Sequence, residues 1–404
     1  MRKIFFPGLM IFFIVCMLGG CQREKDRIIK DKIAEYQEYQ IEESKKEEKQ
    51  NQNEESHPVI EVTTRAEERE KRENLESQEE TGEEEENSSK ISLLFGGDVL
   101  LSDHVLNAYQ RTGGIQGVLD EGYRKLIEDS SFFMVNQEFP FSDRGVQAED
   151  KQFTFRLPTE KVSIFREMGI DGVTLANNHA LDFGQDALLD SIAVLDQAGI
   201  LHTGAGENLE KASVPVTAEI QGMKIAVIGA TRVIPVAGWA AGNSHPGMLA
   251  TYDPAVLLAK IKELRQGCDY VIVYVHWGTE REESPEDYQR SLGHQYIDAG
   301  ADMVIGSHPH VLQGIEYYNG KPIVYSLGNF VFGSSIPKTM LLEVKILPGK
   351  ESQPVLRIFP GTSGAGFTKM LTDENKQQEF YRYMENISFG ITFLSDGTVV
   401  YEKE

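Results

Sequence analysis

The feature that most constrains this chain is a series of short, almost wholly apolar runs that alternate with amphipathic segments. Runs of this length, rich in Ile, Val, Leu and Phe, predict buried strands. The segments between them, such as 115–129, 185–198 and 285–299, predict helices. Strands that alternate with helices predict an α/β core whose sheets are covered by helices. The runs that carry this prediction are 91–95, 132–135, 172–176, 224–229, 270–275, 303–305 and 322–326.

Polar side chains follow several of these runs at the point where each predicted strand ends. In sheets of this kind, ligand sites form beyond the carboxyl ends of the strands, so one cleft could collect these residues. Carboxylate, amide and imidazole donors without a thiolate suit Mn²⁺, Fe or Zn²⁺ rather than a structural zinc. Six are too many for one catalytic ion, so they predict two ions that share a bridging carboxylate. They are Asp98, Glu138, Asn178, His276, His308 and His310.

The turn Gly306-Ser307-His308-Pro309-His310 is the most specific of these strand ends. A single histidine is more often an ordinary core or surface residue, and Asp98 or Glu138 alone would be read as a turn or loop residue. Two imidazoles two positions apart on a tight turn can point at one or two ions. Pro309 fixes its own φ and biases His308 toward an extended backbone.

The charge balance argues against a nucleic-acid partner. The chain holds 40 basic and 63 acidic residues, a formal net charge of −23. No basic stripe is present that could neutralise phosphates. Of the three cysteines only Cys268 lies in the predicted folded part, so no internal disulfide is expected there.

The N-terminus predicts export and a lipid anchor. Arg2 and Lys3 precede an apolar run, 4–18, that is too short for a good membrane span. It ends in Leu18-Gly-Gly-Cys21, which resembles a bacterial lipobox. The resemblance implies a signal peptide over 1–21, lipid on Cys21 and a location on the outer face of the bacterial cell membrane. An uncleaved signal anchor is the alternative.

Residues 22–89 predict a disordered, charged linker. The segment is rich in Glu, Lys, Gln and Ser, with few large apolar side chains, so it cannot offset the entropy of chain ordering. A coiled coil is the alternative. The folded domain is expected over 90–404, with its core motifs in 91–345 and terminal strands and a helix in 346–404. Within that last part, the glycine-rich segment 361–366 is interpreted as a flexible loop rather than a nucleotide cradle. The last strands are expected to form a hairpin over 391–401 that turns at Asp396-Gly397.

Taken together, the strand-end motifs resemble the CapA family, which is associated with poly-γ-glutamate capsule synthesis. The resemblance covers roughly residues 91–345. It implies a branch of the calcineurin-like metallophosphoesterases and therefore a four-layer α-β-β-α sandwich of metallo-dependent phosphatase type. The motifs are Gly97-Asp98, Asn136-Gln137-Glu138, Asn177-Asn178-His179, His276-Trp277-Gly278, Gly306-Ser307-His308-Pro309-His310 and Ser326-Leu327-Gly328-Asn329-Phe330.

The same resemblance implies a role for each site residue. Asp98 and His310 would bind the first ion, Asn178, His276 and His308 the second, and Glu138 would bridge them. His179 would donate a proton or stabilise charge, and Asp182 would orient it. Contacts to substrate are expected from Asn136, Asn177 and Asn329. The superfamily usually has Asp-x-His at the first strand, whereas Leu100 stands here, so the first ion could be weakly held or absent.

Three functions follow as hypotheses. The first is a cell-surface, metal-dependent hydrolase that acts on a phosphoester or on an amide of the poly-γ-glutamate type. The second is a non-catalytic accessory subunit of a capsule polymer synthase or exporter with a degraded site. The third is an envelope or sporulation binding lipoprotein with no role in polymer synthesis. The expected partners are the membrane, through Cys21, and polymer synthase subunits.

Overall fold

Two β-sheets organise the part of the chain that the computed structural model describes, residues 91–346 and 354–401. The first sheet has the order β16 (Phe367–Met370), β15 (Val355–Gly364), β14 (Ser335–Ile346), β1 (Ile91–Val99), β2 (Phe132–Gln137), β3 (Gly172–Thr174), β4 (Leu201–Thr203), with β13 (Asn329–Val331) paired to β1. The second has the order β11 (Leu312–Tyr318), β12 (Lys321–Leu327), β10 (Met303–Ser307), β9 (Tyr270–His276), β7 (Met223–Thr231), β6 (Val216–Ile220).

Each sheet contains a block of four parallel strands. They are β1 to β4 in the first sheet and β12, β10, β9 and β7 in the second. Antiparallel strands flank these blocks: β14 beside β1, β11 beside β12 and β6 beside β7. Because the strands of a block run in one direction, their carboxyl ends lie at one edge of the sheet, where the polar strand-end residues follow.

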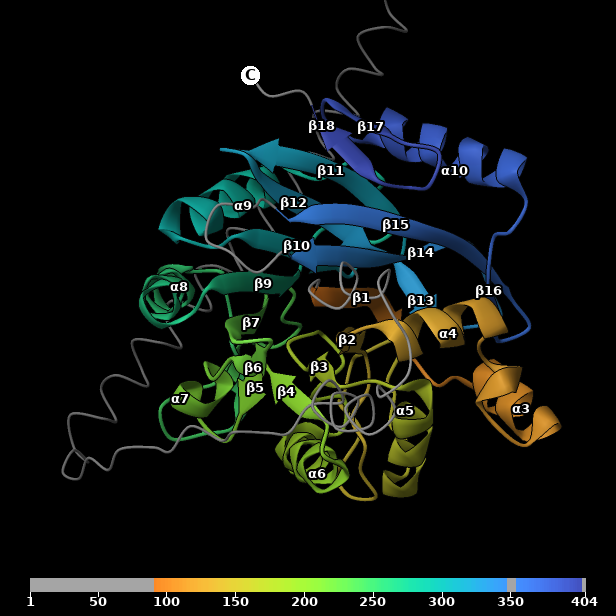
Figure 1. Cartoon of the computed structure of the whole chain (residues 1–404). Helices are drawn as coiled ribbons and strands as arrows, with labels where there is room; N and C mark the ends of the chain where they lie inside the picture. The colour runs from red at the N-terminus through yellow and green to blue at the C-terminus, as the bar shows by residue number, and fades with distance from the viewer. Residues whose placement is uncertain (1–90, 347–353, 402–404) are drawn as a thin grey trace, which may run out of the picture. The chain divides into compact units, whose positions relative to one another are not determined.

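Alternate residues of the central strands face two different cores, as the period of two in a strand requires. In β9, Ile272 and Tyr274 join an apolar cluster that also contains Leu93 and Met134 of the first sheet, so the two sheets pack face to face. Val271 and Val273 point the other way and pack against the helices α8 (Ala255–Gly267) and α9 (Asp287–Ala299), which cover the second sheet (Figure 1).

Helices also cover the outer face of the first sheet. Phe133 points away from the inter-sheet core and packs edge-on against Phe330, whose ring centroid lies 5.5 Å from that of Tyr123 on α4 (Glu121–Asp129). Figure 1 shows α4, α5 (Val162–Met168) and α6 (Gly184–Ala198) on this side, opposite α8 and α9. The predicted four-layer α-β-β-α sandwich is therefore confirmed.

The C-terminal elements complete the inter-sheet core. Phe380 and Met384 of α10 (Glu374–Ile387) and Ile391 of β17 (Ile391–Phe393) belong to the same apolar cluster as both sheets. The predicted terminal hairpin is present, with β17 paired to β18 (Val399–Tyr401). Smaller elements are the helix α7 (Leu209–Ala212), the strand pair β5 (Ala205–Gly206) and β8 (Gly247–Met248), and the 3₁₀ turns η2 (Thr159–Lys161) and η3 (Ala237–Trp239).

The structure differs from the predictions in three local details. The helix α3 (Asp103–Thr112) was not predicted, and the helix expected over 115–129 is a 3₁₀ turn, η1 (Ile115–Gly117), followed by α4. The glycine-rich segment 361–366 is not a flexible loop, because Gly361 pairs with both β14 and β16 in the sheet. A Cβ at Gly361 would lie 2.2 Å from the Tyr123 hydroxyl, so close packing explains the glycine there.

The predicted signal peptide, Cys21 and the linker over 22–89 lie outside the described residues. Within residues 91–346 and 354–401, no helix is long and apolar enough to cross a membrane.

Candidate metal centre

The strand ends of both sheets converge because glycines allow the backbones to approach closely. Gly97 precedes Asp98 in β1, and a Cβ there would lie 1.9 Å from the carbonyl oxygen of Gly328. Gly306 precedes the two histidines of the 306–310 turn, and a Cβ there would lie 1.9 Å from the carbonyl oxygen of Tyr325. No other residue type fits at either position without moving the backbone, so these glycines fix where Asp98, His308 and His310 begin.

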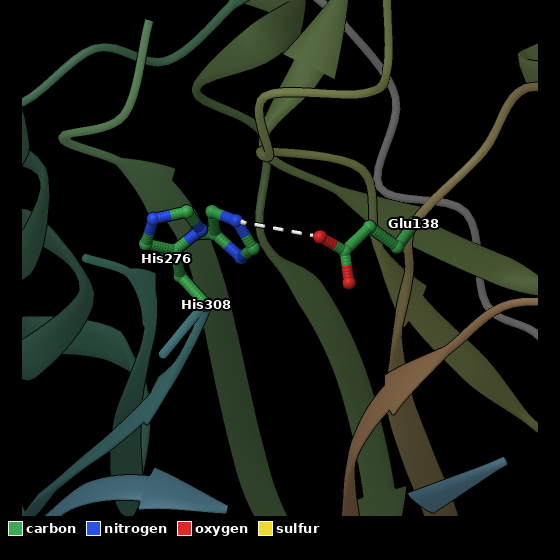
Figure 2. A group of neighbouring side chains, drawn as sticks. All are labelled: Glu138, His276 and His308. Carbon is green, nitrogen blue, oxygen red and sulfur yellow. Dashed lines mark ion pairs between the residues drawn. The ribbon is translucent and has the colours of Figure 1, made fainter. Parts of the chain in front are cut away.

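Two groups of side chains at this edge have the spacing of metal sites, and they share Glu138. One group is Glu138, His276 and His308, and the other is Asp98, Glu138 and His310; the candidate ligand atoms within each group lie within 4.8 Å of one another. Oε1 of Glu138 is 4.0 Å from Nε2 of His276 and 3.7 Å from Nε2 of His310. Figure 2 shows the Glu138 carboxylate pointing toward the imidazoles of His276 and His308.

The burial of these groups favours a bound cation. Asp98 and Glu138 are both 0 % exposed. Three buried atoms of the site have no hydrogen-bond partner among the described residues. They are both carboxylate oxygens of Glu138 and Nδ1 of His308. A buried carboxylate without a hydrogen bond is costly, and divalent ions held by the two groups would offset that cost. The residues present therefore fit a divalent metal ion.

Burial and neighbouring charges shift the pKa values of the side chains in both groups. Burial, and then the neighbouring Asp98 carboxylate, raise the pKa of Glu138 well above its usual range. Burial lowers the pKa of His310, but the nearby Glu138 and Asp98 outweigh it and raise that pKa to about 10. Burial lowers the pKa values of His276 and His308 well below their usual range, so these two rings are neutral. Neutral imidazoles are the form that binds metal.

Outer hydrogen bonds orient two of the imidazoles. Nδ1 of His276 lies 3.0 Å from the Ser307 hydroxyl, which can donate its proton there, and Nε2 lies on the side of the ring that faces Oδ1 of Asn178 and Glu138. Nδ1 of His310 lies 2.9 Å from Oδ1 of Asn329, so its Nε2 also faces Glu138. The expectation of an extended backbone at His308 was wrong: its φ is +100°, a strained conformation of the kind that clusters at functional sites.

His179 and Asp182 form a pair beside the two groups. Nδ1 of His179 is 2.7 Å from Oδ2 of Asp182, and Nε2 of His179 is 4.0 Å from Oε1 of Glu138. Asp182 is fully buried and also accepts a hydrogen bond from the Phe155 backbone N–H at 2.7 Å. Asp182 can therefore orient the ring but lies away from solvent.

Lys151 was missed by the sequence analysis. Its ammonium contacts the Asp182 carboxylate, the Asn178 carbonyl oxygen and Nδ1 of His179. It lies in the connection between β2 and α5, where neighbouring residues such as Phe153 are exposed. No motif or periodicity in this segment distinguishes one lysine from a solvated one, so only the fold reveals its partners.

The predicted asparagines occupy different surroundings. Oδ1 of Asn178 lies 2.8 Å from Nε2 of His276, next to the predicted second metal position. Asn329 is half-buried beside His310. Asn136 and Asn177 are 0 % exposed and their amides bond to other protein groups, a geometry that does not support their predicted contact with substrate.

Comparison with known proteins identifies relatives of this sequence. The bacterial capsule synthesis protein model PGA_cap matches residues 92–334. The chain is 33 % identical over 251 residues to the PGA biosynthesis protein CapA of Bacillus subtilis, covering 62 % of this chain and 65 % of that protein. It is 33 % identical over 262 residues to the capsule biosynthesis protein CapA of Bacillus anthracis, covering 62 % of each. The match thus spans less than two thirds of these relatives.

Solved structures give weaker similarities. The NAD nucleotidase of Haemophilus influenzae aligns with a TM-score of 0.42 at 13 % identity, over 74 % of this chain and 57 % of that one. A hypothetical protein from Thermus thermophilus aligns with a TM-score of 0.39 at 17 % identity, over 68 % and 99 %. These similarities are too weak to bear on function. The family model, by contrast, matches more than half of the sequence, and the chain therefore belongs to the bacterial capsule synthesis protein family PGA_cap.

Proposed function

We propose that this protein is a lipid-anchored envelope protein that takes part in capsule or poly-γ-glutamate synthesis or export through a two-metal, hydrolase-like site. The family supports the polymer role. The observation that carries the metal site is Glu138, which belongs to both ligand groups and has no hydrogen-bond partner among the described residues. A carboxylate in that position suits a bridge between two divalent ions, Mn²⁺, Fe or Zn²⁺.

The proposed chemistry is hydrolysis of a phosphoester or of a γ-glutamyl amide. Bound divalent ions supply Lewis-acid polarisation and lower the pKa of a water molecule toward neutrality. In this chain Asp98, Glu138 and His310 would hold one ion, and Glu138, Asn178, His276 and His308 the other. His179 would face the leaving group through Nε2 and donate a proton or stabilise charge there, because Asp182 holds the ring through Nδ1. Asn329, half-buried at the same edge, is the remaining candidate for contact with substrate.

A non-catalytic accessory role is the second candidate, and one observation favours it. Leu100 stands two residues after Asp98, where the wider superfamily usually carries a histidine, so only Asp98, Glu138 and His310 would be left among the described residues to hold the first ion. One relative, 32 % identical over 209 residues (49 % of this chain and 54 % of the relative), is a probable polyglutamine synthesis accessory protein of Mycobacterium tuberculosis. In this role the metal would stabilise the fold, and the protein would act by binding synthase subunits.

The proposed location is the outer face of the cell membrane. The motif Leu18-Gly-Gly-Cys21 supports cleavage before Cys21 and lipid attachment to its thiol. The charged segment over 22–89 would hold the domain away from the bilayer. The proposed partners are therefore the membrane and membrane-bound polymer synthase subunits.

Complementation tests the function. The full chain and its His308→Ala variant would be expressed in a Bacillus subtilis strain that lacks its own CapA, and secreted poly-γ-glutamate would be measured. Metal content and hydrolysis of a chromogenic phosphodiester would be measured on the purified proteins. Rescue by the wild type but not by His308→Ala supports a metal-dependent role. Rescue by both favours the accessory role, and rescue by neither contradicts the polymer role.

A further inference from the structure

Two buried asparagine side chains connect the two halves of the site. Nδ2 of Asn136 donates to Oδ1 of Asp98 at 2.8 Å, and Oδ1 of Asn136 accepts from Nδ2 of Asn177 at 3.0 Å. Oδ1 of Asn177 then accepts from the backbone N–H of His179 at 3.0 Å. We call this series, Asp98–Asn136–Asn177–His179, the amide ladder. It begins at a candidate metal ligand and ends at the candidate proton donor.

The ladder also reaches the shared carboxylate. Nδ2 of Asn177 donates a second hydrogen bond to the carbonyl oxygen of Gln137 at 2.7 Å, directly before Glu138 in the chain. Nδ2 of Asn136 lies 3.4 Å from Nδ1 of His276. The two amides thus touch the side chain or the adjoining backbone of four site residues, which lie in or after strands of both sheets.

Only a primary amide can serve at both positions. Each ladder residue must donate from one end of a short, planar group and accept at the other. Aspartate would place a carboxylate oxygen against an acceptor, and leucine, with nearly the same shape, would leave buried partners without hydrogen bonds. Since Asn136 satisfies Oδ1 of Asp98, Oδ2 is left to face Nδ1 of His310, 3.3 Å away.

We propose that Asn136 and Asn177 are positioning residues that fix the Asp98 carboxylate, the Glu138 segment and His179 relative to one another. This inference rests on the proposed metal site and deepens it. It assigns both residues a role inside the protein, in place of contact with substrate. Outer hydrogen bonds of this kind typically change metal affinity about 10- to 100-fold when they are removed.

A double-mutant cycle on the full-length protein in detergent tests the proposal, with Mn²⁺ affinity and the visible absorption of the Co²⁺-loaded protein as readouts. Asn136→Leu is expected to weaken Mn²⁺ binding about 10- to 100-fold. Asn177→Leu is expected to weaken it about tenfold, although Asn177 contacts no ligand side chain. Because the two act in series, the double variant should bind no more weakly than Asn136→Leu alone, and both single variants should alter the Co²⁺ spectrum.

A buried amide outside the site provides the matched control. Gln313 is 0 % exposed and accepts a hydrogen bond from Nε2 of Gln289 at 2.9 Å, so Gln313→Leu removes a comparable bond. Its Mn²⁺ affinity and Co²⁺ spectrum should equal those of the wild type. If Asn177→Leu does not fold, as judged by circular dichroism, Asn177→Ser replaces it, because it loses both bonds donated by the amide and adds no charge beside the site.

The outcomes separate this inference from the proposed function. If the wild type binds neither Mn²⁺ nor Co²⁺, both the proposed metal site and the proposed role of the ladder are disproved. Wild-type binding that is unchanged in a folded Asn177 variant overturns the ladder alone. The ladder's role is also overturned if the fold-losses of Mn²⁺ affinity in the two single variants multiply in the double variant. Multiplying losses would indicate independent damage at two buried positions.

Discussion

Glu138 and His310 follow strands of different sheets, yet Oε1 of Glu138 lies 3.7 Å from Nε2 of His310. The first follows β2 and the second follows β10, so the contact exists only while the two sheets are packed together. A metal ion held by both residues would connect the sheets. Binding to the native state alone stabilises a fold, by about 2.7 kcal/mol at a free metal concentration one hundred times Kd.

Replacing the shared carboxylate should therefore affect both metal content and stability. We expect Glu138→Gln to lose most of the bound metal, because Glu138 is the one residue common to both ligand groups. Elemental analysis of the purified full chain measures the loss. Added Mn²⁺ should raise the Tm of the wild type and leave that of the variant almost unchanged.

Glu343 offers a control of the same chemistry. It is buried in β14 and accepts a hydrogen bond from the Ser92 hydroxyl at 2.7 Å, outside both ligand groups. Glu343→Gln should keep the wild-type metal content. A Glu138→Gln protein that retains as much metal as this control would disprove the bridging role.

Metal affinity should rise with pH. Since the pKa of His310 is raised to about 10 and that of Glu138 is also raised, these side chains bind protons more strongly than they would in water. A metal ion must displace these protons, so its apparent affinity falls as the pH falls, by up to about tenfold per pH unit for each proton displaced. Competition with a chelator between pH 6 and pH 8 measures the slope. His310→Gln should reduce it, and a pH-independent affinity in the wild type would contradict the proposed ligand set.

Much of the fold was predictable because its signals are local. The run 270–275 is apolar at every position, as expected of a central parallel strand that is buried on both faces, and β9 is buried throughout. The helix α3 was missed although Ser102 and Asp103, a typical helix start, separate the rest of it from the strand β1. Its buried side, Val105 and Ala108, is too small to give a distinct apolar pattern.

Only those site residues that stand at the ends of strands could be predicted from the sequence. Asp98, Glu138, His276 and His308 follow apolar runs, so their convergence could be inferred from the topology of parallel strands. No comparable rule predicts which residue a side chain in a long connection will contact. Lys151 reaches Asp182, and Asn136 reaches Asn177, through contacts between segments far apart in sequence. These contacts are set by the packed fold and leave no local pattern.

The lipid anchor can be tested by a pair of cysteine variants. Cys16 and Cys21 both lie at the N-terminus, but only Cys21 stands where lipobox processing requires a cysteine. We expect Cys21→Ser to move the protein out of the membrane fraction or to leave it as an unprocessed precursor, whereas Cys16→Ser should behave as the wild type. Fractionation and metabolic labelling with a fatty acid measure both effects. Equal labelling of the Cys21→Ser protein and the wild type would refute the anchor.

Lys151 should stabilise the fold through Asp182. The Lys151 side chain is 14 % exposed and the Asp182 side chain is 0 % exposed, so the pair is shielded from solvent. Lys151→Met would leave the Asp182 carboxylate buried without its cation, and breaking such a pair from one side costs about 3 kcal/mol. Chemical denaturation measures this loss. Replacing both partners, Lys151→Met with Asp182→Asn, removes the uncompensated charge and should restore part of the stability. If the double variant is less stable than Lys151→Met by the full effect of Asp182→Asn alone, the two side chains do not act as a pair, and the lysine would be an incidental neighbour of His179.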